Sequence, residues 1–184
     1  MTIFRVSFCI LCERSFQEKR GETGVNEKDV EHYMKLYRRS VIAAALCYVK
    51  NYADADDIMQ EVFFKLYTYN GLFESDEHVK AWLIRCAINQ SKNLLGSRWY
   101  RLSLPLESAE SIVHYDHPPC EAKMPELLCK LSKNTRIVLY MYYYEGYSAK
   151  EVSKILGISK SAVNSRLKRG RQKLKKLLTE GKEQ

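Results

Sequence analysis

The chain has 184 residues, enough for one medium-sized domain or two small ones. With 46% hydrophobic and 28% charged residues, its composition excludes a chain that is disordered throughout. The formal net charge of +8 at pH 7 indicates an anionic partner. Residues 159–178 hold eight Lys or Arg and no Asp or Glu. A run of one sign predicts a surface for a polyanion such as nucleic acid.

No stretch of the sequence has the length of a membrane-spanning helix. The apolar segment 3–12 lacks the basic leader and the small-residue cleavage site of a signal peptide. Six cysteines in such a basic chain favour free thiols over a disulfide framework. We therefore expect a cytoplasmic protein without membrane insertion.

Two groups of metal-ligating residue types occur. Cys9 and Cys12 have the spacing of half a zinc site or of a redox pair, and His114, His117 and Cys120 lie three residues apart. A single metal site formed by both groups together is one alternative, and the absence of any metal site is the other. Because no second cysteine pair of suitable spacing lies near the first, and thiols are common in helical cores, we predict no metal and no cofactor.

The first half of the chain predicts three helices. Apolar residues recur on one helical face over 27–49 and again over 53–69, where an Asn-Gly pair ends the second helix. Ser75 is the predicted N-cap of the third helix, because acidic residues then lie at its positive end. This helix ends near Gly96.

The segment 103–124 contains three prolines and several acids, and it has no sustained period, which predicts a flexible linker. Fully extended at ~3.3 Å per residue, it could span up to roughly 70 Å. Three further helices are predicted at 125–144, 148–156 and 159–178. We therefore predict an all-α fold with a 1–26 extension and two small domains, 27–102 and 125–184.

The last two helices have the pattern of a helix-turn-helix. Ser148 and Glu151 form a predicted capping box, Gly157 supplies the turn, and Ser159 caps the second helix. The early part of such a helix meets base edges in the major groove, and later cations meet phosphates. Its polar face holds Lys160, Ser161, Asn164, Arg166, Lys168 and Arg171.

An ordinary helical hairpin with a solvated basic face is the alternative. The cap, the glycine turn, the apolar spacing and the one-sided charge agree with one another, which favours a DNA-binding helix-turn-helix.

Two polar faces are also predicted in the first half. Asp54, Asp57 and Glu61 share one helix face, although clustered acids near a helix start can simply complement the dipole. On the next helix, amide and basic side chains line up without acids. This pattern suits nucleic acid and a solvated polar face equally well. The aligned residues are Arg85, Asn89 and Lys92.

Two longer motifs resemble a known family. The stretch Asp54-Ala-Asp-Asp-Ile-Met-Gln-Glu-Val-Phe-Phe-Lys65, followed by Ala81-Trp-Leu-Ile-Arg-Cys-Ala-Ile-Asn89, resembles the second region of bacterial sigma-70-type factors. Residues 139–178, with Glu145-Gly-Tyr-Ser148 and Ile155-Leu-Gly-Ile-Ser159, resemble the fourth region. Two regions joined by a short linker are the layout of extracytoplasmic function (ECF) sigma factors.

The resemblance implies partners and roles. In the family, the acidic helix of the second region docks on clamp helices of core RNA polymerase, a role that falls on Asp54, Asp57, Gln60 and Glu61. The next helix and its preceding loop hold the unwound promoter strand, here through Asn70, Phe73, Arg85, Asn89 and Lys92. The fourth region binds duplex promoter DNA through Lys160, Ser161, Asn164, Ser165 and Lys168. An anti-sigma factor, often membrane-bound, commonly restrains such proteins.

Two other functions compete with this one. A dimeric helix-turn-helix repressor or activator explains residues 148–178 but leaves the acidic face without a role. A thiol-redox enzyme that uses Cys9 and Cys12 needs an activating helix N-terminus or cation, which the sequence around them does not supply. Because no catalytic carboxylate pair, phosphate loop or nucleophile motif occurs elsewhere, we expect a non-catalytic protein.

Overall fold

The computed structural model describes residues 25–49, 51–97 and 124–180. All regular structure within these ranges is helical, which confirms the all-α prediction for them. The helices are α2 (Glu27–Leu46), α3 (Tyr52–Tyr67), α4 (Asp76–Gly96), α6 (Met124–Cys129), α7 (Lys133–Tyr143), α8 (Ala149–Leu156) and α9 (Lys160–Glu180). Residues 1–24 of the predicted extension and 103–123 of the predicted linker lie outside the described residues. No described helix is both long enough and apolar enough to cross a membrane.

Helices α2, α3 and α4 form one group, in which polar side chains set each start. The Asn26 side chain accepts a hydrogen bond from the Asp29 amide at 3.0 Å, and the Asp29 carboxylate accepts one from the Asn26 amide at 3.1 Å. Asn51 caps α3, and Ser75 caps α4 as the sequence predicts. Because these side chains satisfy amides that have no partner within the helix, they fix where each helix begins.

The second group contains α6, α7, α8 and α9, and its start differs from the sequence prediction. The single helix expected at 125–144 is wrong, because the chain turns at residues 130–132 between α6 and α7. The Arg136 guanidinium donates hydrogen bonds to the carbonyls of Leu128, Cys129 and Leu131, at 3.0, 2.7 and 3.1 Å. These contacts satisfy the carbonyls that a helix end leaves free, and apolar periodicity gives no sign of them.

Helix α9 crosses α7 at a very short distance. Gly170 is buried on the α7 side of α9, in line with buried Val163 and Leu167. A Cβ placed at Gly170 would lie 2.7 Å from Cδ1 of Leu139 and 2.9 Å from Cγ2 of Thr135. The hydrogen of glycine therefore allows the two helices to approach, and this approach turns the basic side of α9 outward.

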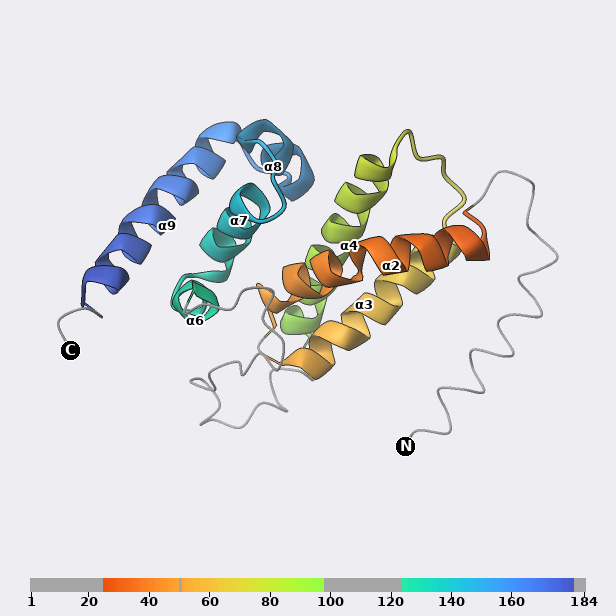
Figure 1. Ribbon diagram of the computed structural model, residues 1–184, viewed down its shortest axis with the longest axis horizontal. Helices are drawn as coiled ribbons and strands as arrows, with labels where there is room; N and C mark the ends of the chain where they lie inside the picture. Colours follow the sequence, from red (N-terminus) through yellow and green to blue (C-terminus); the bar gives the residue numbers. More distant parts are fainter. Residues whose placement is uncertain (1–24, 50, 98–123, 181–184) are drawn as a thin grey trace.

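The two groups are in contact, with α4 next to α8 (Figure 1). Lys80 of α4 forms an ion pair with Glu145, which lies in the turn between α7 and α8, at 2.6 Å. Arg136 also donates a hydrogen bond to the carbonyl of Cys47 at 3.3 Å. The core is continuous across this contact, so the two predicted domains are packed together in this structure.

The close crossing of α7 and α9 makes a stability prediction. Gly170→Val should lower the free energy of unfolding by about 1–3 kcal/mol, because the branched side chain overpacks the crossing. Chemical denaturation followed by circular dichroism measures this change. Gly96→Val is the control: a Cβ at Gly96 meets no heavy atom within 4 Å, and surface changes of this kind stay within about 0.5 kcal/mol. Equal losses in the two variants would contradict the role of Gly170.

Candidate polymerase-binding and nucleic-acid-binding surfaces

The acidic face predicted on α3 forms on a capped helix start. The Asn51 side chain accepts a hydrogen bond from the Asp54 amide at 2.7 Å and donates one to the Asp54 carboxylate at 2.9 Å. Asp57 follows one turn later and is half-buried, and Glu61 is exposed. The cap thus holds the first carboxylate of this face in place, and the helix aligns the other two with it.

Gln60 lies beside this face and is held by a neighbouring acid. Its side-chain amide donates to the Asp56 carboxylate at 2.8 Å, and Asp56 pairs with Arg38 of α2 at 3.2 Å. Phe64 is one turn further along and is 51% exposed. Sequence reasoning missed this apolar side chain. The signal was available, because adjacent helical residues point about 100° apart, so the residue next to buried Phe63 points away from the core.

The second polar face lies on α4. Arg85, Asn89 and Lys92 are all exposed, because buried Leu83, Ala87 and Ile88 fix the opposite side of the helix in the core. The Lys92 ammonium lies 5.8 Å from the centroid of the Tyr48 ring. The structure therefore brings the three predicted side chains onto one solvent-facing surface.

The loop before α4 has a different arrangement from the one expected. The Phe73 ring is half-buried, 5.0 Å from the Tyr69 ring and 5.7 Å from the Trp82 ring between centroids. Asn70 is exposed, and Leu72 is 76% exposed. Phe73 therefore holds the loop against α4, and Leu72, which sequence reasoning missed, is the apolar side chain that projects from it.

The helix-turn-helix has the predicted caps. The Ser148 hydroxyl accepts a hydrogen bond from the Glu151 amide at 3.3 Å, and the Glu151 carboxylate accepts one from the Ser148 amide at 2.8 Å. Bonds from Ser148 lower the pKa of Glu151. Gly157 ends α8 with a φ of 64°, a conformation that side chains disfavour. The Ser159 hydroxyl then accepts a hydrogen bond from the Ala162 amide at 3.2 Å, which starts α9.

Most of the predicted duplex-binding residues lie on the outer side of α9. The exposed ones are Lys160, Ser161, Asn164, Ser165, Lys168 and Arg171. Arg166 differs, because it is half-buried and its charge acts on Tyr48 of the other group. Burial raises the pKa of Tyr48 to about 12, and the Arg166 cation opposes that rise. Arg166 is therefore turned toward the first group in this structure.

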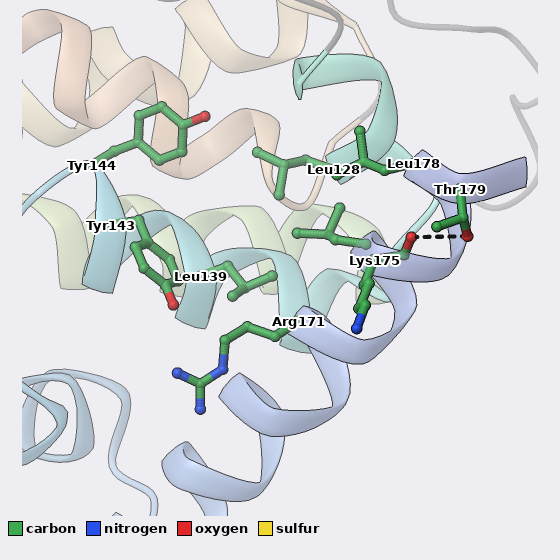
Figure 2. Close-up of a pocket in the computed structure, with 9 residues that line it drawn as sticks. Leu128, Leu139, Tyr143, Tyr144, Arg171, Lys175, Leu178 and Thr179 are labelled. Carbon is green, nitrogen blue, oxygen red and sulfur yellow. Dashed lines mark hydrogen bonds between the residues drawn. The ribbon is translucent and has the colours of Figure 1, made fainter. Parts of the chain in front are cut away.

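An apolar groove of about 510 Å³ lies between α6, α7 and the second half of α9 (Figure 2). Figure 2 shows leucine and tyrosine side chains along it, with Arg171 and Lys175 at one edge. Sequence reasoning missed this groove, because its walls come from two separate segments of the chain, 128–144 and 171–179. The lining residues are Leu128, Leu139, Tyr143, Tyr144, Arg171, Leu174, Lys175, Leu178 and Thr179.

Among the described residues, no group of three or more His, Cys, Asp or Glu has the arrangement of a metal site. Cys47 and Cys86 are buried, and burial raises the pKa of both thiols, that of Cys47 to about 12. Such thiols stay protonated and unreactive at neutral pH. The Cys9 and Cys12 pair and the group of His114, His117 and Cys120 lie outside the described residues.

Comparisons with known proteins account for both halves of the chain. The family model for sigma-70 region 2 matches residues 33–101, and the model for sigma-70 region 4 matches residues 122–174. The RNA polymerase sigma factor NccH of Alcaligenes xylosoxydans xylosoxydans is 30% identical over 76% of this chain and 81% of its own length. The ECF RNA polymerase sigma factor SigW of Bacillus subtilis is 26% identical over 90% of this chain and 95% of its own.

The fold has a solved counterpart as well. The sigma factor RpoE of Bartonella quintana, crystallised in complex with the anti-sigma factor NepR, superposes with a TM-score of 0.66 at 23% identity, over 83% of this chain and 98% of that one. Because the matches cover the acidic half as well as the helix-turn-helix, they favour neither an operator-binding regulator nor a thiol enzyme. The chain belongs to the sigma-70 family, in its ECF group, and is an RNA polymerase sigma factor that serves promoter-specific transcription initiation.

Proposed function

We propose that this sigma factor divides initiation among three surfaces: the acidic face of α3 for core polymerase, the polar face of α4 for the unwound strand, and α9 for duplex DNA. The observation that carries the proposal is the outer side of α9. The Gly170 crossing fixes the inner side of this helix in the core, and the outer side presents cations and hydrogen-bonding side chains with no acid over residues 159–178. The cations suit contacts with DNA phosphates, and the hydrogen-bonding side chains suit contacts with base edges.

The docking surface combines charge and apolar contact. Asp57 and Glu61 provide the charge, and the Asn51 cap positions Asp54 beside them. Gln60 adds a side-chain amide, and exposed Phe64 adds an aromatic anchor of the kind that contributes most to interfaces. We propose that charge steers the sigma factor to a basic polymerase surface and that Phe64 supplies contact area.

The strand-opening surface runs from the loop to α4. Asn70, Arg85, Asn89 and Lys92 offer donors to a separated strand, and Phe73 positions the loop through its aromatic contacts. Leu72 projects from the loop, where an apolar side chain can contact an unstacked base. Amide and basic side chains suit a single strand, since they bind both base edges and phosphates.

For the duplex element, we assign base contacts to residues 160–168 of α9 and a phosphate contact to the later cation on the same side, Arg171. The base-reading set is Lys160, Ser161, Asn164, Ser165 and Lys168. Arg171 lies further along the same side, which suits a phosphate contact. Arg166 is half-buried and its charge lies near Tyr48, so its contribution to DNA binding requires a change of position.

We propose an anti-sigma factor as a further partner and the apolar groove as its docking site. Support comes from the related RpoE structure, which contains an anti-sigma factor, and from the groove itself. Its leucine and tyrosine lining suits the apolar stripe of an amphipathic helix, and the cations at its edge favour acidic residues flanking that stripe (Figure 2). The occupant is thus an acidic amphipathic helix.

The proposed site of action is the cytoplasm, where bacterial polymerase meets promoter DNA. No chemistry is assigned to this chain itself, because the proposed surfaces bind and position polymerase and DNA while the polymerase joins nucleotides.

The docking surface makes the first functional prediction. Asp57→Lys/Glu61→Lys should weaken binding to core RNA polymerase at least about tenfold, because like charges placed in an interface repel. Competition against the wild-type chain for core polymerase measures the affinity, and promoter-directed transcripts should fall in parallel. Glu27→Lys/Glu31→Lys is the matched control, since it changes the net charge equally on exposed positions of α2. Normal competition by the first variant would remove the docking assignment.

A second prediction concerns strand opening. Asn89→Ala/Lys92→Ala should reduce open-complex formation at least about tenfold while leaving polymerase binding unchanged, because charge-assisted hydrogen bonds contribute about 1.5–3 kcal/mol each. Permanganate reactivity of unpaired thymines, on a promoter mapped with the wild-type protein, reports the melted bases. Lys35→Ala is the control, because this exposed side chain pairs with Glu31 of its own helix, α2. Wild-type reactivity in the double variant would mean that this face is a solvated surface without a role in strand opening.

The third prediction separates base reading from charge. Lys160→Ala and Asn164→Ala should each cost ~1–3 kcal/mol on a duplex selected by the wild-type chain from a random library, and little on its scrambled version. Arg171→Ala should weaken both duplexes alike and reduce the salt slope by about one unit. Lys173→Ala is the control, because two residues rotate a helical side chain by about 200° from Arg171. Equal losses on both duplexes for Lys160→Ala and Asn164→Ala would reduce α9 to an electrostatic anchor.

A further inference from the structure

The contact between the two helical groups contains a buried ion pair. Lys80 of α4 and Glu145 of the α7–α8 turn meet at 2.6 Å, and their side chains are only 23% and 7% exposed. These residues belong to the segments that match different sigma-70 regions. Because salt screens buried charges weakly, the attraction between these two charges persists at physiological ionic strength.

The turn around Glu145 is built to hold its carboxylate at this position. The Glu145 amide donates to the Tyr140 carbonyl at 3.2 Å, and the Tyr147 amide donates to the Met141 carbonyl at 3.0 Å. Gly146 between them has a φ of 77°. The Tyr140 hydroxyl donates a hydrogen bond to the second carboxylate oxygen of Glu145. The acid is therefore preorganised to receive a cation from the other group.

The same contact has features of a closure that can open. The Lys80 ammonium lies 5.5 Å from the centroid of the Tyr147 ring. The Tyr147 hydroxyl is buried with no hydrogen-bond partner among the described residues. A buried hydroxyl without a partner costs free energy that water would return on separation. The hydrogen bond that Arg136 donates to the Cys47 carbonyl across the same contact is long, at 3.3 Å.

We propose that the Lys80–Glu145 pair is a latch that holds the two regions of the free protein closed, and that the latch opens when core polymerase binds. The first part concerns the shape of the free chain and stands apart from the proposed function; the second part rests on it. In the closed form, the strand-opening face of α4 and the recognition helix α9 keep a fixed position relative to each other, and the Arg166 charge lies near Tyr48. Open, a segment of the length of 103–124 allows the two regions to reach DNA elements up to roughly 70 Å apart.

The latch predicts an unequal response to removing one charge or both. Lys80→Met leaves the Glu145 carboxylate buried without its cation, so separation, which rehydrates the carboxylate, becomes favourable. Lys80→Met/Glu145→Gln removes both charges, and the glutamine oxygen still accepts from Tyr140. This double variant should stay closed, because neutral groups of similar shape replace the pair.

Small-angle X-ray scattering of the full chain tests the shape directly. A compact chain of this length has a radius of gyration of about 16 Å before its tails are counted, and Lys80→Met should increase the measured value by at least about 3 Å over wild type. The double variant should return toward wild type. Lys35→Met, which breaks an ion pair whose lysine is 79% exposed, should leave it unchanged. Circular dichroism should show the same helix content in all four proteins. A closed Lys80→Met, or a double variant as open as the single one, would overturn the latch.

Binding to core polymerase tests the second part. If only the open form binds, the affinity scales with the open fraction, so Lys80→Met should bind up to about tenfold more tightly than wild type and the double variant should not. An opened Lys80→Met with wild-type affinity would overturn the gating role. If neither the wild type nor any variant binds core polymerase, the proposed function is wrong. The scattering result would still test whether the Lys80–Glu145 pair holds the two regions closed.

Discussion

The arrangement of the group formed by α6, α7, α8 and α9 depends on one guanidinium. Arg136 donates to the last carbonyls of α6 and to the turn that follows, and it reaches the carbonyl of Cys47 at the end of α2. A single cation thus ends one helix, lies in the next and touches a third. Arginine suits this task, because its planar fork presents several donors at once and always carries its charge. The position of α7 follows from these bonds, and α9 in turn packs on α7 through Gly170.

Local chemistry explains why much of the fold could be predicted from the sequence. Ser75 and the Ser148–Glu151 box act within three residues of the amides that they cap, so the sequence shows both partners together. The glycine turn at Gly157 is equally local. The break between α6 and α7 was missed because Ser132 makes no side-chain cap bond and the stabilising donor lies on Arg136, inside the next helix.

The candidate surfaces also contain features that local sequence predicts and features that depend on distant contacts. Helical spacing placed Arg85, Asn89 and Lys92 on one face, since a helix fixes neighbours three and four residues apart. The orientation of Phe73 depended on Tyr69 and Trp82, whose rings form a cluster only after the loop folds back on α4. Arg166 likewise belongs by sequence to the recognition helix, and only the packing of two distant segments brings its charge near Tyr48.

Closure and function are compatible because the contact uses other sides of the helices than the proposed binding faces. On α4, Arg85, Asn89 and Lys92 follow Lys80 by five, nine and twelve residues, which places them about 120–180° from it around the helix. The strand-opening face therefore remains exposed in the closed form, as does the outer side of α9. What closure withholds is the freedom of the two regions to move apart. A restraint of this kind acts on the geometry between surfaces, so it can be released without remodelling any one of them.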